Sequence, residues 1–343
     1  MKKNFDEVFE DVTKLGTKIR ADEYHLTGKY QIIDQGQEAI AGYTDLEKGL
    51  LEDVPTIIFG DHTRIIKYVD KPFFLGADGV KVLRSRFRDA NYRYLFYALR
   101  GITIPNTGYN RHFRLLKESK IEYPSTEKQV EIVSVLEHVS KIIEHRQLQL
   151  QKLDELVKSR FVELFGDPVN NSMGLKTIPL GKACCLKAGI TTPADMIHEQ
   201  SNKFSIPCYG GNGIRGYVES ATQSGCYPII GRQGALCGNV QLATGKFHAT
   251  EHAVLVTPLI ETNVVWLFYL LKMMDLYRFH TGAAQPGLAV KTLNTVDIPI
   301  ADVTVQHQFA TFVEQTDKSK VAAQKALDEA QLLFDSLMQK YFG

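Results

Sequence analysis

Two patterns in the second half of the 343-residue chain have spacings found in enzyme sites. Residues 211–216 (GNGIRG) satisfy Gly-x-Gly-x-x-Gly, which cradles a dinucleotide when a helix begins at the glycines. Residues 248–252 (HATEH) satisfy His-x-x-Glu-His, which binds zinc when both histidines share one helix face. However, residues 217–219 (YVE) indicate extended chain and residues 253–256 (AVLV) a strand. We therefore expect neither a cofactor nor a metal, and assign the glycines to a loop whose backbone can closely approach a partner or DNA.

Two further catalytic patterns are also incomplete. Glu118 and Lys120, with Asp89 upstream, imitate a nuclease pair, but Leu293 and Thr295 occupy the corresponding places in the second half. The chain contains no Asn/Asp-Pro-Pro-Tyr/Phe segment, which amino-methyltransfer to adenine or cytosine would require. The sequence therefore predicts no catalytic residue.

Polar side chains after predicted strands have the types that contact nucleic acid. Arg and Lys suit phosphates, Arg also suits guanine, and Asn or Gln suits adenine. The base-contact candidates in the second half are Arg215, Arg232, Gln233, Asn239 and Gln241, and those at corresponding places in the first half are Gln35, Gln37, His62, Thr63 and Arg64. Arg111, His112, Arg114 and, in the second half, Lys291 are the phosphate-contact candidates. A solvated polar surface is the alternative interpretation of each one.

Composition indicates an ordinary folded protein of two or more domains. The net charge is +1, 44% of residues are hydrophobic and 23% are charged. A locally basic stretch at residues 81–114 is compatible with nucleic acid or with a solvated helix face. Five cysteines without a Cys-x-x-Cys pair indicate free thiols, and neither the N-terminus nor residues 264–274 indicates a signal or a membrane span. We expect a cytoplasmic protein that does not bind a membrane.

The chain contains an internal repeat of about 170 residues. Residues 159–166 (SRFVELFG) align with 336–343 (SLMQKYFG), and YLFYAL from Tyr94 aligns with WLFYLL from Trp266. Residues 40–43 correspond to 214–217, and 57–60 to 228–231. Each repeat begins with short apolar runs bounded by glycines, which predict strands, while YLFYAL and WLFYLL predict short helices. Each repeat therefore starts as a mixed α/β globule.

Each repeat ends in a segment that predicts one long helix. Residues 127–165 contain no Gly or Pro, and Ser125 or Thr126 can cap their start. Apolar residues recur with a 3.5-residue period, which is typical of a coiled-coil seam. The seam candidates are Leu136, Ile143, Leu150, Leu153, Val157 and Leu164 in the first helix and Leu327, Phe334 and Leu337 in the second.

A helix of 39 residues is about 58 Å long, so it cannot bury its apolar stripe against its own small globule. The simplest partner is the other long helix. Because the second globule starts where the first helix ends, we expect an antiparallel pair with Leu150 near residues 323–327. The alternative is a long helix that packs only for stability.

This order of elements resembles the specificity subunit of type I restriction–modification systems along nearly the whole chain. The resemblance is carried by residues 209–217 (YGGNGIRGY), 230–234 (IGRQG), 249–252 (ATEH), 297–299 (DIP) and the two helices ending in Phe-Gly. It implies an α+β protein in which two target-recognition globules alternate with two antiparallel coiled-coil helices around a pseudo-twofold axis. The first half departs from the pattern at residues 34–38 and 60–63, which makes its contacts harder to assign.

The resemblance also implies domains, partners and a role. The domains would be residues 1–123 (first recognition domain), 124–166 (first spacer helix), 167–299 (linker and second recognition domain) and 300–343 (second spacer helix). The protein would read a bipartite site on double-stranded DNA and dock methyltransferase subunits, two in number, and restriction or translocase subunits that perform the catalysis. The alternatives are a coiled-coil scaffold for proteins, the recognition subunit of a related type II enzyme, and a small-molecule enzyme that uses the glycine motif.

Overall fold

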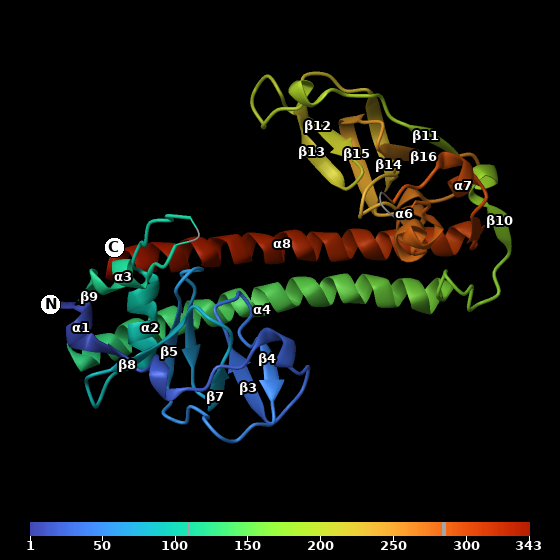
Figure 1. Ribbon diagram of the computed structural model, residues 1–343. Helices are drawn as coiled ribbons and strands as arrows, with labels where there is room; N and C mark the ends of the chain where they lie inside the picture. Colours follow the sequence, from blue (N-terminus) through green and yellow to red (C-terminus); the bar gives the residue numbers. More distant parts are fainter. Residues whose placement is uncertain (109, 283–285) are drawn as a thin grey trace. The chain divides into compact units, whose positions relative to one another are not determined.

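The computed structural model describes residues 1–108, 110–282 and 286–343, which form two compact units. Unit 1 comprises Met1–Gln147 and Lys325–Gly343, and unit 2 comprises Leu148–Gln324. Each unit contains a mixed α/β globule together with part of each of two long helices, α4 (Thr126–Phe165) and α8 (Val303–Phe342) (Figure 1).

The globule of unit 1 is built on three small sheets. Their strand orders are β1-β9, β2-β8-β5-β6 and β4-β3-β7. The strands are β1 (Lys2–Asn4), β2 (Phe9–Asp11), β3 (Tyr30–Ile33), β4 (Gly42–Thr44), β5 (Thr56–Gly60), β6 (Ile66–Val69), β7 (Phe73–Leu75), β8 (Val80–Ser85) and β9 (Lys120–Glu122). The helices are α1 (Phe5–Val8), α2 (Tyr92–Arg100) and α3 (Phe113–Lys117), with 3-10 turns at Thr13–Leu15 and Ala21–Glu23.

The globule of unit 2 is built on two sheets, with strand orders β10-β17 and β11-β16-β14-β15-β12-β13. The strands are β10 (Thr177–Pro179), β11 (Cys184–Ala188), β12 (Ile206–Gly210), β13 (Gly213–Val218), β14 (Gln223–Gly231), β15 (Val240–Ala249), β16 (Ala253–Pro258) and β17 (Asp297–Pro299). The helices are α5 (Leu180–Ala183), α6 (Val264–Met273) and α7 (Val290–Asn294), with 3-10 turns at Ala194–Met196 and Leu276–Phe279.

The two strand orders confirm the internal repeat. The order β2-β8-β5-β6 in unit 1 corresponds to β11-β16-β14-β15 in unit 2, and β4-β3-β7 corresponds to β13-β12-β15. The long strand β15 of unit 2 corresponds to both β6 and β7 of unit 1. Because β6 and β7 belong to separate sheets, unit 1 has one sheet more. Tyr43 pairs with His25, and Tyr217 pairs with His198 in the same way, as the predicted alignment of residues 40–43 with 214–217 requires.

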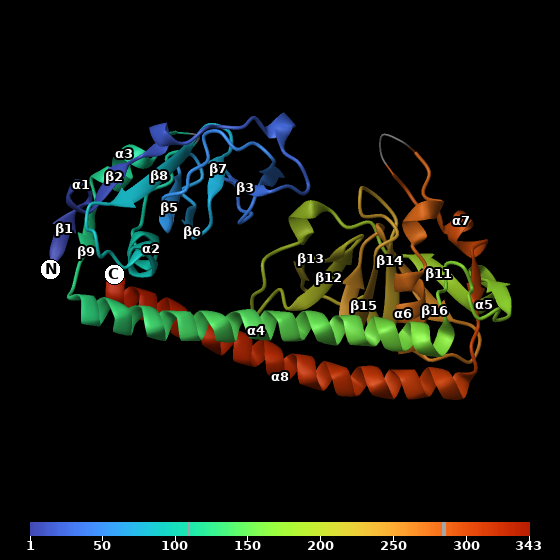
Figure 2. The same cartoon turned by 90° about the horizontal axis from the view of Figure 1, so that it is seen from below.

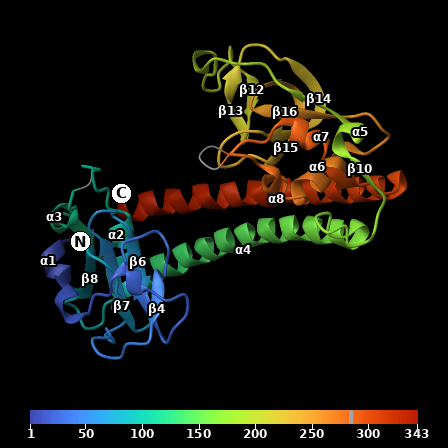
Figure 3. The same cartoon turned by 45° about the vertical axis from the view of Figure 1, so that its right-hand side comes forward.

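The two predicted short helices form where expected, as α2 and α6. Asn91 and Asn263 cap them, because each side-chain oxygen accepts a hydrogen bond from a backbone N–H in the first turn. In unit 1, Tyr94 of α2 contacts Phe342 near the end of α8, and Figure 2 shows α2 close to this end of the helix. In unit 2, Tyr269 of α6 contacts Phe309 near the start of α8, and Figure 3 shows α6 beside this part of the helix. Each globule therefore packs on the long helix through its short helix.

The predicted helix seam is buried or half-buried at every candidate position. Leu136, Val157 and Phe334 are buried, and the other six are half-buried. The α4 helix begins at Thr126, one residue before the predicted start, with the Ser125 hydroxyl accepting from the Lys128 N–H. A 3.5-residue apolar period therefore located the buried face of both helices.

Within unit 2, the segments of α4 and α8 run in opposite directions. Asp154 and Lys320 form an ion pair of 2.7 Å, while Phe161 further along α4 contacts Phe309 earlier on α8 at 5.4 Å between ring centroids. Phe161 and Phe165 are fully buried although they lie outside the predicted seam. They face the globule as well as α8, since Phe165 also contacts Trp266.

The basic stretch at residues 81–114 is largely neutralised inside unit 1. Arg84 pairs with Glu10 and Asp53, and Arg93 pairs with Asp70 and Glu137. The solvated or structural interpretation therefore describes these cations better than a continuous basic face.

No helix among the described residues is long and apolar enough to cross a membrane.

Candidate nucleic-acid interface

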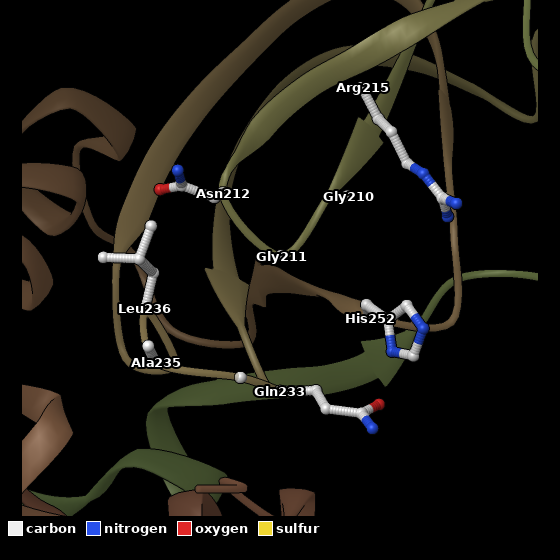
Figure 4. A pocket seen from close by; sticks show the side chains of 9 residues that line it. Gly210, Gly211, Asn212, Arg215, Gln233, Ala235, Leu236 and His252 are labelled. Atoms are coloured by element: carbon white, nitrogen blue, oxygen red, sulfur yellow. The ribbon is translucent and has the colours of Figure 1, made fainter. Parts of the chain in front are cut away.

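An open pocket of about 510 Å³ gathers three loops of unit 2 (Figure 4). The β12–β13 turn, the loop between β14 and β15, and the turn before β16 all contribute. Its lining residues are Gly210, Gly211, Asn212, Arg215, Gln233, Gly234, Ala235, Leu236 and His252. Figure 4 shows Arg215 and His252 on one side of the opening, with Asn212 and Leu236 on the other. Two of the five predicted second-half contacts, Arg215 and Gln233, therefore line one cavity.

Glycines make this arrangement possible by bringing backbone against backbone. A Cβ atom at Gly231 would collide with the carbonyl oxygen of Gly211, and a Cβ atom at Gly211 would lie 3.3 Å from the carbonyl oxygen of His252. The three loops can therefore converge only when these positions carry no side chain. Inside unit 2 the glycines therefore serve the approach of one backbone segment to another, while close approach to a partner or DNA stays a prediction.

The loop between β14 and β15 is held by hydrogen bonds to neighbouring segments of unit 2. The N–H of Arg232 donates to His252 O at 3.0 Å, and that of Gly234 donates to Pro286 O at 2.9 Å. The Asn239 side chain donates to Asn212 Oδ1, which ties this loop to the β12–β13 turn. Asn239 is therefore a positioning residue, whereas Gln233 is exposed.

Two other predicted contacts lie nearby in unit 2. Gln241 is half-buried on β15 beneath the turn, with its side chain 3.8 Å from a Cβ built at Gly213. Lys291 is exposed on α7. The segment before α7 is joined to the pocket loop, because the Leu288 N–H donates to Arg232 O at 2.8 Å.

A carboxylate supports the wall that carries Arg215 and His252. Burial by itself would raise the pKa of Glu251. The backbone N–H groups of Glu251 and Thr192, together with the nearby His252 and Arg215, outweigh this effect, so the pKa lies below its ordinary value. Glu251 lies 3.3 Å from His252, and Thr192 N donates to it at 3.1 Å. The acid is therefore ionised and can orient both side chains.

The two enzyme-like motifs lie in strands and turns. Residues 211–216 form the β12–β13 hairpin, and residues 248–252 run from the end of β15 into a turn before β16, so the predicted strand follows. His248 lies 2.7 Å from the Thr192 hydroxyl, and burial lowers the pKa of His248. Among the described residues, no cluster of three or more His, Cys, Asp or Glu side chains is arranged to hold a metal.

The corresponding place in unit 1 is filled by a side chain. Gln35 occupies the position of Gly211, and Gly79 occupies that of His252, since Asp61 N donates to Gly79 O as Arg232 N donates to His252 O. The Gln35 amide donates to Asp78 O at 2.9 Å and accepts from His62 N at 3.1 Å. Gln35 thus closes in unit 1 the space that is open in unit 2.

Other first-half candidates also hold their own loop. The Thr63 hydroxyl donates to Gln35 O at 2.7 Å, and Arg64 donates to Ile104 O at 3.1 Å from a left-handed backbone conformation with φ of 62°. His62 Nδ1 lies 3.2 Å from Asn110 O. Gln37, in contrast, is exposed at the tip of the β3–β4 loop.

The structure corrects the prediction for His112. This residue is 0% exposed, and its ring nitrogens lie near Asp61 O at 3.1 Å and the Thr107 hydroxyl at 3.2 Å. Its backbone N–H donates to Asp61 O, and in unit 2 the N–H of the buried Leu288 donates to Arg232 O in the same way. His112 is therefore the counterpart of Leu288 and occupies a core position. A phosphate cannot reach it. Its neighbours Arg111 and Arg114 are exposed.

Four pocket side chains, Asn212, Ala235, Leu236 and His252, were missed by the sequence reasoning. Asn212 and His252 lie inside the very motifs that we discounted as enzyme patterns, and Leu236 is apolar and so was not considered as a polar contact. Asn212 and His252 could have been found, because the sheet order brings the β12–β13 turn and the turn before β16 to the same pocket. Nothing in the spacing of Leu236 predicted its exposure.

Comparison with known protein families gives one matching segment in each half of the chain. The family model described as "Type I restriction modification DNA specificity domain" matches residues 1–153 and 179–330. The specificity subunit of the type I restriction enzyme EcoprrI from Escherichia coli is 40% identical over 139 residues. That match covers 40% of this chain and 35% of the relative, so the chain spans about a third of the relative's length.

Two solved structures share the fold. The type I restriction–modification S subunit from M. genitalium superposes with a TM-score of 0.67 at 19% identity, covering 100% of this chain and 96% of that one. A chain from a study of the assembly and conformational transition of a type I restriction–modification system gives a TM-score of 0.56 at 15% identity, covering 100% and 97%. With the family model matching most of both repeats, the chain belongs to the family of type I restriction–modification specificity subunits.

Proposed function

We propose that this protein is the sequence-specific duplex-DNA recognition subunit of a type I restriction–modification complex and is not itself catalytic. The observation that carries the proposal is the repeated strand order, which presents loops with exposed Arg and Gln side chains in both units. Two such surfaces suit a target in two parts. Methylation and cleavage are then the work of partner subunits, two methyltransferase subunits and the restriction or translocase subunits.

The proposed reading surfaces differ between the units. In unit 2, Arg215 and Gln233 reach bases from the open pocket, and Lys291 contacts a phosphate. Arg232 lies half-buried at the start of the same loop, Asn239 positions the β12–β13 turn, and Gln241 lies half-buried on β15. In unit 1, Gln37 reaches bases, Arg111 and Arg114 contact phosphates, and Gln35, His62, Thr63 and Arg64 hold the loops.

The proposed spacer is an antiparallel coiled coil of α4 and α8. The buried seam and the Asp154–Lys320 ion pair support it, and a helix of 40 residues is about 60 Å long. The domains are then residues 1–123 and 167–299 for recognition and residues 124–166 and 300–343 for the spacer. A spacer of this length would hold two reading surfaces too far apart to share a base pair, so each unit would read its own part of the target.

Binding to duplex DNA at several salt concentrations tests the proposal. The chain is assembled with type I methyltransferase subunits, and its affinity for a random-sequence duplex is measured between 50 and 200 mM salt (about the range over which counterion release is strong). We expect the affinity to fall steeply with salt, since each phosphate contact adds about one to the slope. A protein-binding scaffold would show no duplex binding, and that result would overturn the proposal.

A further inference from the structure

Leu236 is a large apolar side chain placed where a polar one would be expected. It lies in the loop between β14 and β15 with 55% of its surface exposed, beside the exposed Ala235. This loop runs from residue 232 to 239, whereas the corresponding loop of unit 1 runs only from 61 to 65. The second unit therefore has a three-residue extension that carries an apolar group into the solvent.

The loop that exposes Leu236 is held in place by backbone hydrogen bonds. The N–H of Cys237 donates to Gly234 O at 3.0 Å, that of Gly238 to Gly231 O at 2.7 Å, and that of Asn239 to Leu236 O at 3.2 Å. Cys237 is buried in the core and anchors the loop from within. The fold thus holds Leu236 at the surface, on the wall of the pocket that Arg215 and Gln233 also line.

The surroundings of Leu236 define the chemistry of that partner. Gly210, Gly211 and Gly234 leave bare backbone in the same pocket, and Arg215 and Gln233 place hydrogen-bond donors there. The complement is a small apolar group flanked by hydrogen-bond acceptors. In the DNA major groove, this combination is the C5-methyl group of thymine beside its O4 acceptor and the acceptors of neighbouring bases.

Unit 1 offers no such site at the equivalent place. The Gln35 side chain fills the space above Gly79, and the shorter loop between β5 and β6 carries no counterpart of Leu236. At this place, a methyl-sensitive contact is therefore expected from unit 2 and not from unit 1.

We propose that Leu236 contacts the C5-methyl group of a thymine in the part of the target read by unit 2, which makes it a specificity-determining residue. This inference rests on the proposed function and names one base of the target by its chemistry. Burying one methyl group contributes about fourfold in affinity, from ~0.8 kcal/mol per buried carbon at 1.4 kcal/mol per factor of ten.

The test uses the chain assembled with methyltransferase subunits. Its preferred duplex is first selected from an unmodified random library, in which thymine is the only base with a C5-methyl group. Each thymine of that duplex is then replaced in turn by uracil, which removes the methyl group alone. We expect one replacement to weaken binding about fourfold for the wild-type chain, and Leu236→Ser to abolish that difference. Leu259→Ser is the matched control, because Leu259 is 62% exposed elsewhere in unit 2.

Several outcomes would overturn the inference. A selected target without thymine, a target with no methyl-sensitive position, or a methyl effect that Leu236→Ser leaves intact would each do so. Loss of methyltransferase binding in Leu236→Ser would instead assign Leu236 to a protein contact, and would also overturn the inference. If the assembled chain selected no duplex at all, the proposed function would fail, and that result differs from sequence-selective binding without methyl dependence.

Discussion

Replacing Phe309 with alanine should destabilise unit 2 strongly. Phe309 is 0% exposed on α8, and its ring lies 5.4 Å from that of Phe161, 5.7 Å from that of Phe165 and 5.4 Å from that of Tyr269. It therefore joins α4, α6 and α8 at one point. Truncating a buried phenylalanine leaves a cavity and lowers the free energy of unfolding by about 3–5 kcal/mol.

The assay is urea denaturation followed by tryptophan fluorescence. Trp266 is the only tryptophan of the chain, is 1% exposed and lies 5.9 Å from the Phe165 ring, so its emission reports unit 2. With a denaturant dependence of about 1–3 kcal/mol/M, Phe309→Ala should lower the midpoint by about 1 M or more. Val321→Ala, on an exposed face of the same helix, should change stability by less than about 0.5 kcal/mol. A Phe309→Ala midpoint close to the wild-type value would refute the described packing of the three helices.

Three more predictions concern the helices, the phosphate contacts and the thiols. Leu150→Pro removes a helix hydrogen bond from α4 at a cost of about 3 kcal/mol or more, and should abolish copurification of methyltransferase subunits; unchanged copurification would count against the spacer. Lys291→Ala should weaken all duplexes alike and lower the salt slope by about one, while Lys325→Ala on α8, 78% exposed, should leave the slope unchanged. Burial raises the pKa of the Cys184 thiol to about 12. Iodoacetamide at about pH 8 should therefore label the exposed Cys185 well before Cys184, as measured by peptide mass spectrometry. Equal labelling of the two thiols would contradict the burial of Cys184.

The sequence predicted the elements well because periodicity reports burial directly. The 3.5-residue period located the buried faces of α4 and α8, and the repeat located α2 and α6 from a shared run of aromatic and aliphatic residues. What it missed on α4 were Phe161 and Phe165, because these side chains pack on a globule folded from distant residues.

The candidate interface was harder to predict for a physical reason. Polar residue type does not reveal whether a side chain faces solvent or holds its own loop, and Gln35, Arg64 and His112 all do the latter. For His112, the repeat contained a usable signal, because its counterpart Leu288 is apolar and buried. The open pocket of unit 2 could not be foreseen, since it depends on Gly211 standing where unit 1 has a glutamine.

The measurement that decides whether the two units read independently is methylation-site profiling of an exchanged chain. Residues 177–299 are replaced by the corresponding segment of a relative, and the chain is expressed in cells with type I methyltransferase subunits. Sequencing of the methylated sites should show one part of the target replaced and the other part unchanged. Changes in both parts, or an unchanged target, would contradict the two-reader account.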